Sequence, residues 1–426
     1  MRIDLQLFMI CTLFGLVSSA RTGGPAKITY NKATLRAAPT DKKRFNVILR
    51  GSTVSKRDQR KDLSQSLNKS VGFLNNIINR SLVANFASNG ESEKLHSTYL
   101  IGNNFAGYTA TLSADTINLV SNQDEVAYIE EDMDITIHVY QKFAPWGLGR
   151  LNKEKNDREL NVYDVDYKVS ETGKGVTVYL IDSGIRATHM DFEGRVADQV
   201  AFVSSDKSVD ERGHGTGVAG VVGGKRTGVA KDATLKSIKV IDNTSGSVST
   251  VLKGIQWVMD DYVNGGKKPS IVNMSVGLES SHSNSMDDSV AAMISSGLQV
   301  IVAAGNTGID ACNISPSSVS DSVVVGAISN DSDKYSKFSN MGSCITLSAP
   351  GELILRPISS DDVSFIPSSG TSVAAPIVTG LVALYLEKNP TATPAQIKQY
   401  LIDTSKAAAT STPKDTTNLI AQYVSI

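Results

Sequence analysis

Three glycine-flanked segments carry an aspartate, a histidine and a serine in that chain order: Asp182-Ser183-Gly184, Gly213-His214-Gly215 and Gly370-Thr371-Ser372. A serine hydroxyl is a weak nucleophile at neutral pH, so it needs an imidazole to accept its proton and a carboxylate to orient that imidazole. Each segment alone is typical of a turn or loop, whereas the three together are a complete set for nucleophilic attack on a carbonyl carbon. We predict that Ser372 attacks, that His214 transfers the proton, and that Asp182 stays ionised beside the imidazole.

These residues need a scaffold, and the sequence from about residue 174 onward predicts a sheet. Apolar β-branched runs alternate there with helix-period segments such as 249–263, which is typical of an α/β fold with a mostly parallel sheet and helices on both faces. Asp182 closes the first expected strand and Asn306 follows the fourth, so both are expected in the crevice at the carboxyl ends of the strands. The expected strands are Val176–Ile181, Thr234–Ile241, Ser270–Val276, Leu298–Ala303 and Val323–Ile328, and the run Val373–Leu386 is expected to be a helix that starts beside Ser372.

The N-terminal part of the chain has a different composition. Residues 1–20 combine a basic start, an apolar run and a small-residue exit, which is typical of a cleavable secretory signal. Residues from about 42 to 137 are charged and polar and predict a separate small α+β domain, with strands at Arg44–Leu49, Tyr108–Leu112 and Glu125–Ile135 and a helix at Asp62–Phe86. We therefore divide the chain into a signal peptide (1–20), a pro-region (21–140) and the α/β domain (141–426).

Charge and hydropathy exclude two classes of partner. The chain has 42 basic and 43 acidic residues, a net charge of −1, and no basic tail, so nucleic acid is not an expected partner. No run after the signal is apolar for the eighteen or more residues that a membrane span needs. We expect a protein of the secretory pathway that ends outside the cell or in a lytic compartment such as a vacuole.

Cysteine usage agrees with that route. Of three cysteines, Cys11 lies in the signal segment, which leaves Cys312 and Cys344 with one intramolecular pairing. In an oxidising compartment we expect a disulfide, with two buried free thiols as the alternative. Asn273 begins a sequon but is expected in a buried strand; the sequons compatible with glycosylation are at Asn68, Asn79, Asn243, Asn313 and Asn330.

Residues 145–426 resemble the subtilisin superfamily, nearest to its fungal proteinase K branch. The resemblance rests on ordered blocks that include Pro145-Trp146-Gly147-Leu148, the segments around Asp182, His214 and Ser372, Val272-Asn273-Met274-Ser275, Ala303-Ala304-Gly305-Asn306 and Ala349-Pro350-Gly351. The region before it resembles the propeptide inhibitor of that superfamily, a ferredoxin-like fold, through residues 105–108 and 126–132. The resemblance implies a serine endopeptidase made as a zymogen, which cuts itself between Ile135 and Lys142 and is inhibited by its own propeptide.

The same resemblance implies further site residues. Asn306 supplies a side-chain donor to the oxyanion, together with the backbone N–H of Ser372. A polypeptide substrate pairs as an added strand with two edges, Ser245-Gly246-Ser247 and Ser275-Val276-Gly277. The specificity pocket has walls at Ala303, Ala304 and Gly305 and a floor at Ala311, which implies broad specificity with an apolar or aromatic preference, modified by Ile314 at the rim. We expect a monomer.

This sequence departs from the family pattern at several positions. Gly217 stands where the family usually has a second histidine, and Val373 and Ile377 replace a methionine and a histidine. None of these belongs to the triad, so we expect effects on packing or rate. Thr346 stands where an aspartate commonly binds calcium, so that site lacks its main carboxylate. We expect no required cofactor and no metal site, and calcium stays an open possibility that Thr346 argues against.

The sequence bears on three alternative functions. Residues 215–220 fit the GxGxxG pattern of dinucleotide binding, but a polar run precedes them where a strand is needed, so we expect these glycines to let a helix pack closely beside His214. A GxSxG elbow is absent, which argues against an α/β-hydrolase esterase. The stronger alternative is a non-catalytic subtilisin fold kept for binding, suggested by Gly217 alone. His189 and His282 lack a glycine-rich flank and are expected at the surface.

Overall fold

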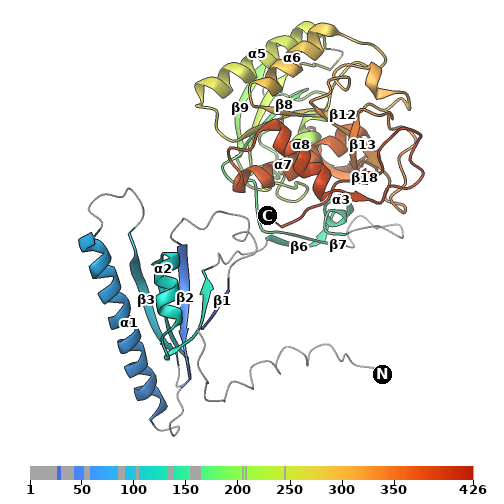
Figure 1. Ribbon diagram of the computed structural model, residues 1–426. Coiled ribbons are helices and arrows are strands. Elements are labelled where there is room, and N and C mark those ends of the chain that lie inside the picture. Colours follow the sequence, from blue (N-terminus) through green and yellow to red (C-terminus); the bar gives the residue numbers. More distant parts are fainter. Residues whose placement is uncertain are drawn as a thin grey trace, which may run out of the picture. The chain divides into compact units, whose positions relative to one another are not determined.

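A computed structural model describes residues 26–29, 43–51, 58–84, 92–101, 105–132, 139–153, 165–203, 206, 209–243 and 246–425. The chain divides into two compact units, Met1–Ile135 and Thr136–Ile426 (Figure 1). The signal segment and the residues directly around Ile135 lie outside the described part. Over the described residues, no helix is both long and apolar enough to cross a membrane.

The N-terminal unit is a five-stranded sheet covered by two helices. Its strands β1 (Lys27–Thr29), β2 (Lys43–Leu49), β3 (Lys94–Ile101), β4 (Phe105–Leu112) and β5 (Val126–Glu131) lie in the order β1-β5-β2-β4-β3. Helices α1 (Gln59–Ala84) and α2 (Ala114–Ser121) contribute Leu63, Leu74, Ile117 and Val120 to its core. The order β2-α1-β3-β4-α2-β5 is the ferredoxin-like arrangement, so the predicted α+β domain is confirmed.

The C-terminal unit is built on a nine-stranded sheet in the order β17-β18-β14-β13-β12-β11-β8-β10-β9. All pairs are parallel except β17 with β18. The strands are β8 (Thr177–Asp182), β9 (Val196–Ala201), β10 (Thr234–Lys239), β11 (Ser270–Met274), β12 (Gln299–Ala303), β13 (Val323–Ile328), β14 (Ile345–Pro350), β17 (Lys406–Ala407) and β18 (Leu419–Ile420). Two short antiparallel pairs flank it, β6 (Val139–Ala144) with β7 (Val165–Val169) and β15 (Ile354–Pro357) with β16 (Phe365–Ser368).

Alternation along the strands gives the sheet two apolar faces. In β8, Val178 and Leu180 join the core formed with helices α4 (His214–Gly223) and α7 (Thr371–Lys388), whereas Tyr179 and Ile181 join the core formed with α5 (Val248–Asn264) and α6 (Asn284–Ser295). Figure 1 shows α5 and α6 on one side of the sheet and α7 with α8 (Pro394–Thr404) on the other. Burial on both faces requires continuous apolar strands, which is why the sequence predicts them well.

The α/β prediction is confirmed, with small differences at element ends. All five expected strands are present, and the helices expected at 249–263 and 373–386 are α5 and α7. Strand β5 ends at Glu131, and the N–H of Asp132 still donates to the carbonyl oxygen of Arg44 in the neighbouring strand. The expected end of this strand at Ile135 lies outside the described residues. The sequence did not predict β3, β9, β14 or the short strands near the C-terminus, whose shorter or more polar runs give a weaker pattern.

Candidate active site

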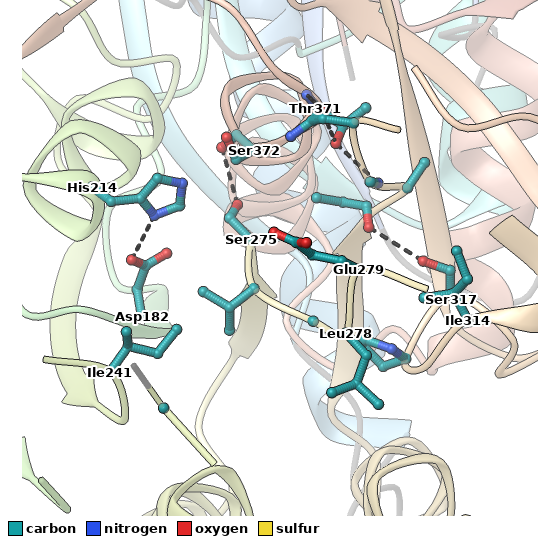
Figure 2. Close-up of a pocket in the computed structure, with 18 of the residues that line it drawn as sticks. Asp182, His214, Ile241, Ser275, Leu278, Glu279, Ile314, Ser317, Thr371 and Ser372 are labelled. Carbon is teal, nitrogen blue, oxygen red and sulfur yellow. Dashed lines mark hydrogen bonds and ion pairs between the residues drawn. The ribbon is translucent and has the colours of Figure 1, made fainter. Parts of the chain in front are cut away.

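One cavity of about 510 Å³ lies at the carboxyl ends of β8, β11 and β12 and at the first residues of α4 and α7 (Figure 2). Its lining includes Asp182, His214, Asn306 and Ser372. The four residues are separated by up to 190 positions in the sequence, and the parallel sheet brings the strand ends that carry them to one edge. The predicted crevice therefore exists, and the four predicted residues share it.

The carboxylate of Asp182 holds the ring of His214. Asp182 Oδ1 lies 2.7 Å from His214 Nδ1 and also accepts a hydrogen bond from the N–H of Ser183. The aspartate side chain is 2% exposed, whereas a third of the histidine side chain is exposed to the cavity. Gly215 permits this approach, because a Cβ there would lie 2.2 Å from the carbonyl oxygen of Gly184. The glycines around His214 are therefore needed for the contact between α4 and the end of β8.

A second buried aspartate, Asp210, fixes the start of α4. Its two oxygens accept hydrogen bonds from Ser183 Oγ (2.8 Å), the N–H of Gly213 (3.0 Å), and both the N–H and the hydroxyl of Thr216 (2.8 and 2.6 Å). Gly213 begins the helix with a φ of +67°, which favours glycine. Sequence reasoning treated residues 208–212 only as a polar run. The missed signal is an acidic residue just ahead of a helix start, where the free N–H groups favour a carboxylate.

The surroundings of His214 set the direction of its pKa. Burial of the ring lowers the pKa, whereas the charge of Asp182 and its hydrogen bond raise it, and the net result is a pKa above the ordinary value for histidine. Two weaker influences oppose each other, since Arg356 lowers the pKa and Asp210 raises it. An imidazole in this position is thus suited to hold a proton temporarily.

Ser372 is the second residue of α7, a helix of 18 residues. Figure 2 shows Ser372 and His214 on facing sides of the same pocket, with the histidine ring held on its other side by Asp182. Ser275 Oγ donates to the backbone oxygen of Ser372 (3.0 Å), and it accepts from Asn273, which in turn accepts from Thr379 in α7. This buried chain ties β11 to the start of α7. Asn273 is fully buried, so its sequon is a false match, as predicted.

The side chain of Asn306 has one defined orientation. Its Oδ1 accepts from the backbone N–H of Thr371 (2.8 Å) and from the Thr371 hydroxyl (2.9 Å). A backbone N–H only donates, so the atom it meets must be the amide oxygen and the amide NH₂ must point away from Thr371. Because Asn306 lines the cavity, this NH₂ and the N-terminal end of α7 are both available to stabilise negative charge there.

Most of the residues predicted to bind substrate line the cavity: Gly246, Ser275, Val276, Gly277, Ala303, Ala304 and Gly305. Ser245 lies outside the described residues. Ser247 is not part of the lining, and its side chain caps α5 by accepting a hydrogen bond from the N–H of Thr250. Gly246 pairs with Ile241 across from the 275–277 segment, so the cavity has two backbone edges.

Ala311 is a correction to the predicted pocket floor. It begins the short turn Ala311–Asn313, and its N–H donates to the carbonyl oxygen of Met341 (2.8 Å). Its side chain belongs to a small core with Ala304, Val324 and Ile345, and Ala311 is not among the residues that line the cavity. Ile314 lines the cavity instead. The prediction was wrong because the depth of the turn depends on this long-range bond.

The cavity also contains a charged residue that sequence reasoning missed. Glu279 follows the 275–277 edge, is exposed, and lies against the cavity with Leu278 (Figure 2). Arg212, also exposed, lines the cavity together with Asp182 and Ile241. The one signal in the sequence was that Glu279 lies two residues after the predicted substrate-binding edge at 275–277. Residues next to such an edge are themselves candidates for substrate contact.

The two other histidines beyond Pro145, His189 and His282, differ in their surroundings. His282 is exposed and meets Asp287 at 2.9 Å, as predicted for a surface residue. His189 is a correction, because it is only 1% exposed and its ring packs edge-on against Phe192 and Phe365. It was misread because Phe365, which packs on the ring from a distant part of the chain, is not recognisable from local sequence. Neither histidine lines the cavity.

Cys312 and Cys344 form the predicted disulfide, with their Cα atoms 5.4 Å apart. It joins the turn after Asn306 to the start of β14. Cys11 lies outside the described residues.

Of the predicted glycosylation sequons, four have an exposed asparagine: Asn68, Asn79, Asn243 and Asn313. Asn330 is buried, so it is unsuited to carry a glycan in the folded unit.

The residues at the expected calcium position do not fit a divalent cation. The Thr346 hydroxyl accepts from the N–H of Val324 (3.2 Å), so it is already used, and Thr346 brings no charge. Nearby, the Lys398 ammonium donates to the carbonyl oxygens of Ser320 and Ser322. Within the described ranges, the one cluster of metal-ligand types is Asp310, Cys312 and Cys344, and its two sulfurs are joined to each other.

The other departures from the family pattern are packing positions. Val373 and Ile377 are 3% and 1% exposed and belong to the core between α7, α4 and the sheet. The glycines of the GxGxxG pattern lie inside α4, and a Cβ at Gly220 would meet Pro357 Cδ at 2.1 Å. As predicted, these glycines serve close packing, and the described residues directly before the helix, 209–212, form no strand.

Comparison with known proteins gives matches to both units. Residues 173–419 match the profile of the Subtilase family, and residues 47–138 match that of peptidase inhibitor I9. A subtilase-type proteinase of Schizosaccharomyces pombe is 39% identical over 333 residues, 76% of this chain and 72% of that protein. An extracellular serine proteinase of Thermus sp. is 38% identical over 304 residues, 69% and 71% of the two chains.

Similarity to an alkaline protease and to a solved structure extends this result. Alkaline protease 1 of Aspergillus clavatus is 35% identical over 320 residues, 74% of this chain and 77% of that protein. The crystal structure of a cold-adapted subtilisin-like serine proteinase matches with a TM-score of 0.61 and 37% identity, covering 67% of this chain and all of that chain.

Proposed function

Because the chain belongs to the subtilase family of serine endopeptidases and carries an I9 inhibitor region ahead of the peptidase unit, we propose that Ser372, His214 and Asp182 are its nucleophile, general base and orienting carboxylate. The observation that carries this assignment is the 2.7 Å contact between Asp182 and His214 in the cavity that Ser372 also lines. Asp182 keeps the proton on Nδ1, which leaves Nε2 able to accept the proton of Ser372.

Hydrolysis then proceeds in two steps. Ser372 Oγ attacks the peptide carbonyl as His214 takes its proton, and the tetrahedral oxyanion is held by the Asn306 NH₂ and the N–H of Ser372. The leaving amine receives the proton from His214, which leaves an acyl group on Ser372. Water, deprotonated by His214, then attacks the acyl carbonyl, and the C–O bond to Ser372 breaks as Ser372 Oγ takes the proton back from His214. Loss of the Asn306 donor is expected to lower kcat by about 10² to 10³.

We propose broad specificity with an apolar or aromatic preference. The two backbone edges at Gly246 and at Ser275–Gly277 support sequence-independent pairing of an extended peptide. Ala303, Ala304 and Ile314 support an apolar pocket, since they offer carbon surface next to those edges. The Glu279 carboxylate adds one negative charge to the lining of the cavity.

The inhibitor region and the predicted signal support a secreted zymogen. We propose that the N-terminal unit blocks the cavity until the chain cuts itself between Ile135 and Lys142, and that the mature protein acts outside the cell or in a lytic compartment. The disulfide, and the extracellular serine proteinase among the relatives, support that route. We also propose that no metal is required at the Thr346 position.

Processing of the full-length precursor tests this function. The wild-type precursor is expected to release a mature chain that begins between residues 136 and 142, whereas Ser372→Ala stays intact. Added wild-type mature enzyme should then cut the Ser372→Ala precursor in the same region, which controls for misfolding. Release of the mature chain by purified Ser372→Ala alone contradicts the assignment of the nucleophile.

A further inference from the structure

The space beside Gly217 is filled by an arginine from a distant part of the chain. A Cβ built on Gly217 would lie 2.3 Å from Arg356 Cδ and 2.4 Å from Arg356 Nη1. Gly217 lies in the first turns of α4, the helix that begins with His214, and Arg356 lies in β15. Glycine at 217 and arginine at 356 are therefore complementary, and the side chain missing at 217 is replaced by one from β15.

The guanidinium connects the start of α4, which carries the proposed base, to β16, the strand that comes before the proposed nucleophile in the chain. Arg356 Nη1 donates to the carbonyl oxygen of Gly213 (2.7 Å), the residue directly before His214. Its Nε donates to Ser368 Oγ (2.6 Å), in the strand that leads toward Ser372. Nε and Nη1 belong to one rigid planar guanidinium group. Arg356 therefore constrains the distance between Gly213 and Ser368.

The same group places a positive charge near His214. Arg356 is partly buried, and burial lowers its pKa while Asp210 and Asp182 raise it, but guanidinium stays protonated in the physiological range. The charged groups around the ring are Asp182 from β8, Asp210 from the loop before α4, and Arg356 from β15, with Arg212 lining the cavity. Arg356 therefore partly offsets the two aspartates.

We propose that Arg356 is a positioning residue for His214. From β15 it donates a hydrogen bond to the Gly213 carbonyl at the start of α4, and it fills the space that a side chain at residue 217 would take. The proposal rests on the proposed role of His214 as the base. Gly217 was the one feature that suggested a non-catalytic fold. The Arg356 side chain fills the space beside Gly217, so this feature no longer argues against catalysis.

The test compares Arg356→Met and Arg356→Lys in the mature enzyme. Removing the positive charge of Arg356 stabilises the protonated imidazole of His214 and raises its pKa. The acid limb of the profile of kcat/KM against pH should therefore move to higher pH in Arg356→Met. Loss of positioning should lower kcat about tenfold at high pH, where His214 is neutral in both enzymes. Arg356→Lys keeps the positive charge, so its acid limb should stay at the wild-type pH. It lacks the planar guanidinium, so its kcat should fall, but by less than in Arg356→Met.

Two further variants keep the result interpretable. Gly217→Ala retains Arg356 but pushes it aside, so it should shift the acid limb in the same direction as Arg356→Met, by less. Arg186→Met removes another arginine that binds the same hairpin, through Asp362, and should leave the acid limb unmoved. Covalent labelling by a fluorophosphonate counts active sites in every variant, which separates loss of fold from loss of rate.

An acid limb that stays at the wild-type pH in both Arg356→Met and Gly217→Ala, with kcat unchanged, overturns the proposal. A wild-type protein that neither labels nor hydrolyses peptides overturns the proposed function instead, so the two failures are distinct.

Discussion

The Lys398 ammonium lies 2.7 Å from the carbonyl oxygen of Ser320, and 2.9 Å from that of Ser322. Lys398 comes from α8, and the two carbonyls belong to the loop that leads into β13. Ser322 is two residues before Val324, whose N–H donates to the Thr346 hydroxyl. Burial lowers the pKa of Lys398, and Asp321 opposes that shift. Carbonyl oxygens of this kind are ligands that calcium prefers, and here an internal cation binds them.

Stability should therefore be insensitive to calcium and should depend on Lys398. The unfolding temperature of the mature protein is expected to be the same in excess EDTA and in millimolar calcium. Lys398→Met leaves two carbonyls without their partner, so it should cost about 1 to 2 kcal/mol and lower that temperature by a few degrees. Lys414→Met, at an exposed lysine, is the control. A large drop in the unfolding temperature of the wild type in EDTA argues against this account.

The negative charge of Glu279 should favour peptide substrates with a cationic side chain over substrates with a neutral side chain of similar length. Glu279→Gln is nearly isosteric, so it should reduce kcat/KM for a lysine substrate relative to a norleucine substrate by about 1.5- to 5-fold, the range for an exposed ion pair. The effect should diminish at high salt. Hydrolysis of a phenylalanine substrate is the control and should change little. An unchanged ratio of lysine to norleucine at low salt would exclude this role.

The disulfide should stabilise the segment after Asn306. The bonded cysteines are 32 positions apart, and closing a loop of that length contributes about 3 to 4 kcal/mol in the chain-entropy model. The double variant Cys312→Ser/Cys344→Ser should lose about that much free energy of unfolding, measured in denaturant. Thiol titration of the unreduced, denatured wild type should find no free thiol in the mature chain. Two free thiols there would reject the bond.

Local sequence predicted those parts of the site whose geometry is set by local structure. Asp182 ends a strand, Asn306 follows one and Ser372 begins a helix, so each side chain is placed by the element that carries it. Gly213 and Gly215 mark backbone that must take a positive φ or approach Gly184 closely. These signals lie within a few residues of the functional side chain.

The parts that sequence reasoning missed depend on contacts between distant segments. Ala311 turns inward because of Met341, His189 is buried by Phe365, and Arg356 fills the space of residue 217 from 139 positions away. No periodicity or local motif records such pairs. They appear only when the packing of these distant segments on one another is known.

The most direct test of the central claim is the site of covalent modification by a fluorophosphonate. We expect digestion and mass spectrometry of the labelled mature enzyme to find one adduct, on Ser372. Asp182→Asn should slow labelling by about 10³-fold or more, because His214 loses its required tautomer, and Ser372→Ala should give no adduct. An adduct on another residue, or labelling of Ser372→Ala at the wild-type rate, would contradict the account.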